Sequence, residues 1–104
     1  MTYSDLIAAL KTVIDPVYEL EAPKGATRFV VVSRYGASTV VADDAVQMEL
    51  PKVQLDVCWQ EENDLLLSIV KSALSALYIP YSVQERYYDD DYMAMREILQ
   101  CEVL

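Results

Sequence analysis

The segment from Val46 to Trp59 constrains the fold more than any other part of the chain. Apolar side chains occupy alternate positions up to Leu50, and again from Val53 onwards in the opposite phase. Such period-two alternation is typical of a strand with one face in a core. The phase changes at Pro51-Lys52, and proline cannot donate a hydrogen bond to a strand ladder. We therefore expect one long strand with a bulge or bend near its middle.

Further strands are predicted before this segment. The run from Arg28 to Tyr35 is rich in valine, which disfavours a helix and suits a strand buried on both faces. Gly36 interrupts the run, so residues 38–42 are expected to form a separate strand and Asp43-Asp44 the next turn. Residues 17–22 suit a short extended piece.

Two helices are indicated by apolar residues at helical spacing. The first is expected to begin after Thr2 as N-cap and to end at Asp15-Pro16, because the residue before proline avoids the α region. Its apolar stripe comprises Leu6, Ile7, Leu10, Val13 and Ile14. The second is expected to open in the acidic residues 61–64, with Asn63 as cap, and to stop at Ile79-Pro80. Its buried face comprises Leu66, Ile69, Val70, Ala73, Leu74 and Leu77.

The C-terminal part is expected to form a hairpin. Residues 81–88 alternate as a strand, and Asp89-Asp90-Asp91 marks a turn. Residues 92–104 fit a strand face interrupted by Glu97, although residues 94–99 also have good helix propensity; we favour the strand because it completes the hairpin. The chain, residues 1–104, is thus expected to be a single α+β domain. Its mostly antiparallel sheet of about 4–5 strands would carry two helices packed on one face.

The charge distribution argues against binding to polyanions. The formal net charge is −9, and residues 61–104 hold nine acids against three bases. Tight nucleic-acid binding needs clustered lysine and arginine, so we expect none. No apolar run approaches the roughly 20 residues of a membrane span, so we expect no membrane association and synthesis in the cytoplasm.

The residue types also disfavour an enzyme. The sequence has no histidine, the usual base beside a catalytic thiol, so Cys58 and Cys101 are expected to be reduced and buried. Gly25 and Gly36 are the only glycines, which excludes glycine-rich phosphate loops. We therefore predict no catalytic residues, no cofactor and no metal site.

The acidic, tyrosine-rich turn of residues 87–92 is the sharpest cluster in the sequence. It is interpreted first as a solvated turn, and second as a loop that contacts a partner, since exposed aromatic residues beside polar ones are typical of contact surfaces. A site for a hard cation is a weaker alternative, because the spaced acids and glycine of a calcium loop are missing. The candidate partner-contact or lumen residues are Tyr35, Asp43, Asp44, Tyr87, Tyr88, Asp89, Asp90, Asp91 and Tyr92.

Several local strings occur in an order found in one family. They are Asp15-Pro16-Val17-Tyr18, Arg34-Tyr35, Ala42-Asp43-Asp44, Val53-Gln54-Leu55-Asp56-Val57 and Ile79-Pro80-Tyr81, followed by the acidic hairpin. Over nearly its whole length the chain resembles the tail-completion proteins of siphophages and Gram-positive prophages, also called tail terminator or tail-to-head joining proteins. Cys58-Trp59 departs from the more polar pair that this family often has, which puts the local contacts there in doubt.

The resemblance implies an assembly function without a catalytic motif. Such a protein is expected to form a homo-oligomeric ring, typically a hexamer, that ends the tail tube and docks it onto the head connector. Its partners would be further copies of itself, the major tail-tube protein and the connector or stopper protein, and it would reside in the virion after synthesis in the bacterial host. Another neck component, such as a head-tail adaptor or stopper, is the first alternative. An acidic DNA-mimic inhibitor is the second, although the acids cluster in two turns and one helix start rather than along a face.

Overall fold

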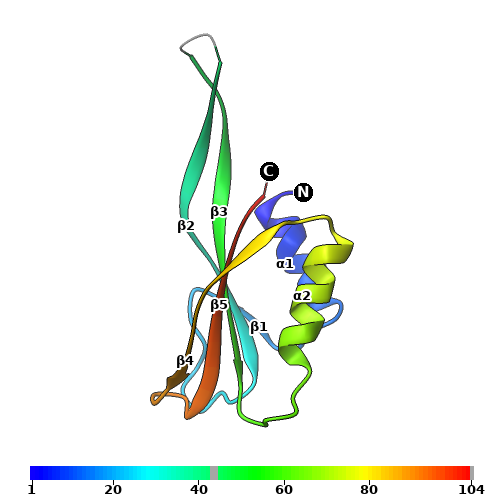
Figure 1. Cartoon of the computed structure of the whole chain (residues 1–104), viewed down its shortest axis with the longest axis vertical. Coiled ribbons are helices and arrows are strands. Elements are labelled where there is room, and N and C mark those ends of the chain that lie inside the picture. Colours follow the sequence, from blue (N-terminus) through cyan, green and yellow to red (C-terminus); the bar gives the residue numbers. More distant parts are fainter. Residues whose placement is uncertain (43–44, 104) are drawn as a thin grey trace.

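A computed structural model describes residues 1–42 and 45–103, with side chains outside residues 37–49. Over these residues the chain forms helices α1 (Tyr3–Lys11) and α2 (Leu66–Ala76) and strands β1 (Val17–Glu19), β2 (Phe29–Ala42), β3 (Ala45–Trp59), β4 (Tyr81–Asp89) and β5 (Ala94–Glu102). The predicted α+β class is confirmed, and the C-terminal segment is the strand that the hairpin interpretation favoured (Figure 1).

The strands form one five-stranded sheet in the order β1-β2-β3-β5-β4. Only β1 and β2 pair in parallel among the described strands, so the sheet is mixed but mostly antiparallel. Both helices lie on one side of it (Figure 1). Their apolar faces pack with the odd-numbered residues of β3 and β5 to make the main core, because a sheet face can leave water only by packing against another layer. Its fully enclosed members include Leu6, Leu10, Val30, Val32, Val53, Leu55, Val57, Val70, Leu74 and Leu99.

The start of β2 is buried on both faces, as its valine-rich sequence predicts. Val30 and Val32 belong to the main core, whereas Phe29 and Val31 point to the other side of the sheet. There they form a second cluster with Cys58, covered by the segment 20–28. Each such buried side chain contributes roughly 1.5–3 kcal/mol of transfer free energy, so this second cluster fixes the covering segment to the sheet.

Strands β2 and β3 extend far beyond their neighbours. They pair with each other down to Ala42 and Ala45, whereas β1 pairs only with residues 30–32 of β2 and β5 pairs only with residues 52–59 of β3. Residues 36–42 and 45–51 therefore project from the body as a two-stranded ribbon, here called the arm (Figure 1). The radius of gyration is 14.7 Å and the longest extent 50 Å, whereas a globular chain of this length has a radius of about 13 Å.

The predicted break at Gly36 is wrong, because β2 runs unbroken from Phe29 to Ala42. Glycine weakens a strand but does not end it here, because Gly36 itself pairs with Lys52 and the ladder with β3 carries β2 through. The predicted bulge is present, with its extra residue in β2 rather than at Pro51-Lys52. The register shifts between Arg34 and Gly36, so Tyr35 is the additional residue opposite the Lys52–Val53 step.

The predicted end of the first helix is also wrong. Thr2 and Asp5 form the expected capping box, but α1 stops at Lys11 instead of Asp15. The Thr12 hydroxyl donates to the Ala9 carbonyl at 2.6 Å, a side-chain bond that competes with helix continuation. In the turn that follows, Ile14 remains buried, but Val13 is 53% exposed and does not belong to the stripe.

The cap expected at Asn63 is absent, because α2 begins at Leu66 and the acidic residues lie in the preceding turn. Asp64 instead provides a hydrogen bond at the start of the helix, because one of its carboxylate oxygens accepts the Leu66 N–H at 2.9 Å. Its other carboxylate oxygen accepts the Arg28 Nε–H at 2.7 Å. The hydrogen bond from Arg28 lowers the pKa of Asp64 below its ordinary value. Asp64 therefore links the start of α2 to the segment before β2.

Candidate functional site

The acidic turn between β4 and β5 does not present its three aspartates equally. Asp89 is the last residue of β4, and its largely buried carboxylate lies 3.4 Å from the Arg96 Nε. The other carboxylate oxygen of Asp89 accepts the backbone N–H of Asp91 at 2.9 Å, which shapes the turn. Asp90 and Asp91 are exposed. Among the predicted acidic contact residues that the structure describes, only these two are free to meet a partner without disturbing the fold.

The three tyrosines of the predicted cluster lie in different surroundings. Tyr92 is half-buried: its ring meets the Phe29 ring edge-on at 5.1 Å, and its hydroxyl donates to the Ala22 carbonyl at 3.0 Å. Tyr87 pairs with Arg96 across the ladder, whereas Tyr88 pairs with Met95 and so faces the helix side of the sheet. Tyr88 is 52% exposed. Tyr92 thus holds the turn to the body, while Tyr88 is the accessible aromatic residue.

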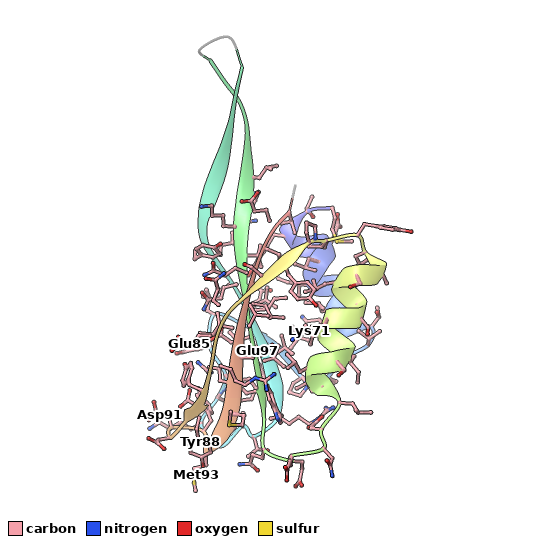
Figure 2. All side chains as sticks on the ribbon, viewed as in Figure 1. Lys71, Glu85, Tyr88, Asp91, Met93 and Glu97 are labelled. Atoms are coloured by element: carbon pink, nitrogen blue, oxygen red, sulfur yellow. The ribbon has the colours of Figure 1, made fainter. Side chains whose placement is uncertain are left out.

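Exposed apolar side chains accompany the two free aspartates. Met93, in the same turn, has a positive φ of 51° and is 67% exposed. Figure 2 shows Tyr88, Asp91 and Met93 together at the end of the β4–β5 hairpin. Exposed aromatic and methionine side chains beside carboxylates make a surface suited to protein contact.

The remaining predicted contact residues lie at the arm. Tyr35, the bulge residue, is exposed and lines a shallow depression at the arm root with Tyr81, Gln100 and Glu102. The bulge therefore brings together two tyrosines from strands that are not neighbours in the sheet. Asp43 and Asp44 lie outside the described residues.

Arg96 is a hub that sequence reasoning did not find. On the sheet face away from the helices, its guanidinium lies 3.2 Å from an Asp56 carboxylate oxygen and 3.2 Å from the Cys58 sulfur. It also stacks over the Tyr92 ring at 5.4 Å. These partners are up to 40 residues apart in sequence, so no local pattern could have revealed them. The hub joins β3, β5 and the acidic turn into one rigid unit.

Both thiols are reduced and buried, as predicted. Burial raises the pKa of Cys58 above its ordinary value, against the hydrogen bond from Arg96, which lowers it. Burial also raises the pKa of Cys101 to about 11. Both thiols therefore stay protonated near neutral pH, and a protonated thiol is a poor nucleophile.

Glu97 is a buried carboxylate on the opposite, helix-covered face. It is 3% exposed and lies between two cations: Lys71 Nζ of α2 at 2.9 Å and Arg86 Nε of β4 at 2.9 Å. Figure 2 shows Glu97 and Lys71 facing each other between the sheet and α2. Arg86 also stacks over the Trp59 ring at 5.5 Å. A buried charge requires such pairing, and the break that Glu97 makes in the apolar alternation was its only sequence signal.

Two further properties bear on candidate chemistry. Within residues 1–42 and 45–103, no cluster of three or more cysteine, aspartate or glutamate side chains is arranged to hold a metal ion. None of the helices in the described part of the chain has the length and apolar character needed to cross a bilayer.

Comparison with known proteins gives no assignment: no protein-family model matches the sequence, and no curated protein matches it significantly. The function must therefore be argued from the residues and their arrangement.

We predict that Glu97→Gln lowers the free energy of unfolding by about 2 kcal/mol, because Lys71 and Arg86 lose their shared counter-charge. The expected loss is smaller than for a fully buried pair, since both cations are partly exposed. Urea denaturation monitored by Trp59 fluorescence measures it. Glu85→Gln, an exposed carboxylate on the same hairpin, is the matched control and should change stability by less than about 0.5 kcal/mol. Equal stability of the two variants would show that the Glu97 pairs contribute nothing.

Proposed function

We propose that this chain is a tail terminator of a long-tailed phage or prophage. Copies of it would assemble into a ring that caps the tail tube and joins the tube to the head connector. The role is structural and includes no catalytic step. The observation that carries the proposal is the arm, a ribbon of residues 36–42 and 45–51 that leaves the body of a small domain.

The arm supports an assembly role because its backbone is only half satisfied. Each arm strand is hydrogen-bonded to the other, and the outer edge of each is unpaired within the described chain, apart from the Pro51 carbonyl at the arm root, which accepts the Val103 N–H. Unpaired strand edges are templates for pairing with another chain, which natural proteins normally shorten or cover. A chain that keeps such an uncovered ribbon is therefore suited to pair with other chains in an oligomer.

The exposed acids favour a role beside DNA rather than on it. The β3–α2 loop with Glu61 and Glu62, and the turn with Asp90 and Asp91, lie at the end of the molecule opposite the arm (Figure 1). In a ring, those of these acids that are turned toward the channel, such as Glu61 and Glu62, would repel the phosphates of passing DNA and keep the channel clear. Together with the family resemblance of the sequence, this supports a neck or tail position.

Native mass spectrometry tests the proposal directly. The chain is mixed separately with the tail-tube protein and with the connector protein encoded beside its gene. A terminator is expected to form a ring, most simply a hexamer, that binds tube ends and stops tube growth. Binding to the connector without any effect on the tube would favour the adaptor or stopper alternative. A chain that stays monomeric with both partners would contradict the proposal.

We predict that the double charge reversal Asp90→Lys and Asp91→Lys leaves folding unchanged and lowers head-tail joining by about tenfold, because it replaces the repulsive or partner-matching charge. Asp89 is excluded because it pairs with Arg96. Phage titre and counts of unjoined heads and tails measure the effect. Asp15→Lys with Glu19→Lys, two exposed acids elsewhere, is the matched control. Normal titres from the Asp90 and Asp91 variant would remove the turn from the function.

A further inference from the structure

The strand edges of this chain differ in how well they are protected. Besides the outer edge of β1, which is only three residues long, the described sheet leaves three edge stretches unpaired: residues 33–42 of β2, residues 45–50 of β3, and the whole of β4. Proteins usually guard such edges with proline, charge, bulges or short strands. The edge with the fewest of these devices is therefore the one best suited to accept a strand from another chain.

The β2 edge is the least guarded one. On β3, Pro51 interrupts the edge, and its carbonyl already accepts the Val103 N–H at 3.1 Å. On β4, a register shift makes Gln84 a bulge, next to the charged pair Glu85-Arg86. The β2 stretch from Ser33 to Ala42 has ten residues and no proline; its one charge, Arg34, and its bulge at Tyr35 both lie at the arm root, so residues 36–42 carry none of these devices.

The ladder shows which backbone groups of the arm point outward. The bond from Val103 to the Pro51 carbonyl means that Pro51 turns its backbone away from β2. Pro51 pairs with Ala37, and Glu49 pairs with Thr39. Because hydrogen-bonded and non-hydrogen-bonded pairs alternate in an antiparallel ladder, both are non-hydrogen-bonded pairs. Ala37 and Thr39 therefore direct their N–H and C=O groups to the open side of β2.

We propose that the β2 edge from Ser33 to Ala42 pairs, antiparallel, with the β4 edge of a second copy of this chain. This inference rests on the proposed function and identifies the contact that would build the ring. The nine residues of β4 match the ten of the β2 edge in length. Contact between two different surfaces can repeat around a ring, whereas pairing an edge with its own copy closes at a dimer.

Charge sets the direction of the pairing. An antiparallel arrangement places the end of β4, with Asp90 and Asp91 just beyond it, beside the root of the neighbour's arm. Two cations lie at that root: Arg34, which is exposed and stacks over the Tyr3 ring at 4.5 Å, and Lys52, whose side chain lies against Gly36. Neither takes part in any of the ion pairs described above. A parallel arrangement would place Tyr81 beside the arm root instead, and the two aspartates would lie far from the two cations.

Cysteine cross-linking tests the contact. Thr39→Cys places a thiol on the β2 edge, and Val83→Cys places one on β4 at a side chain that is 51% exposed. A short bismaleimide at neutral pH is the probe, and the unsubstituted chain controls for Cys58 and Cys101, which are buried. We expect the double variant to give a ladder of covalent oligomers that ends at the ring size. A mixture of the two single variants should give dimers only, and each single variant alone no more than the unsubstituted chain.

Other outcomes separate this inference from the proposed function. Dimers from Thr39→Cys alone would mean a two-fold arm-to-arm contact and would overturn the inference. A ring seen by native mass spectrometry, without a link between positions 39 and 83, would overturn it while leaving the terminator function standing. Cross-linking without any effect on tail tubes would keep the contact and reject the phage role. No self-association under any condition would reject both.

A backbone variant provides an independent check. Thr39→Pro removes an outward N–H and leaves the ladder to β3 intact, so the monomer should keep its melting temperature while the covalent ladder from the double-cysteine positions disappears. Because position 39 carries the proline in this variant, the cysteine on β2 replaces Ala37, and the second cysteine stays at position 83. An undiminished ladder from the proline variant would overturn the proposed edge pairing.

Discussion

The shape of the molecule depends on a difference in length between the two central strands and the strands beside them. β2 and β3 run 14 and 15 residues, whereas β1 has three and β4 and β5 have nine each. The shorter strands and the two helices cover only the half of the β2–β3 hairpin that lies away from the arm, and with it they form the core. They do not extend along the arm, so the outward backbone N–H and C=O groups of the arm can hydrogen-bond only to water or to another chain. The proposed assembly follows from this mismatch.

Two adjacent charges in β5 hold the body to which the arm is attached. Arg96 and Glu97 point to opposite faces because side chains alternate along a strand. Arg96 ties β3 and the acidic turn together on the open face, and Glu97 ties α2 and β4 together on the covered face. The acidic turn is thus a rigid platform rather than a loose loop, and only Asp90, Asp91 and their apolar neighbours face outward from it.

Local patterns predicted much of the fold and little of the site. Alternation from Val46 to Trp59 and the valine run before Tyr35 predicted the central hairpin, since each residue's face depends only on its own strand. The limits of α1 and β2 were wrong because the Thr12 hydroxyl bond and the β3 ladder override single-residue signals. The Arg96 and Glu97 networks join residues far apart in sequence, so only their placement in the sheet reveals them. Tyr92, predicted as a contact residue, is half-buried and packs its ring against Phe29, a contact that no local pattern indicated.

Backbone amide hydrogen exchange over residues 33–42 tests the central claim most directly. Amides such as those of Ala37 and Thr39 face solvent in the single chain and should exchange freely. In the ring assembled on tail tubes, the account predicts that exchange at these positions slows by about a hundredfold or more, because each outward amide gains a strand partner. Unchanged exchange at these positions in a ring that has formed would contradict it.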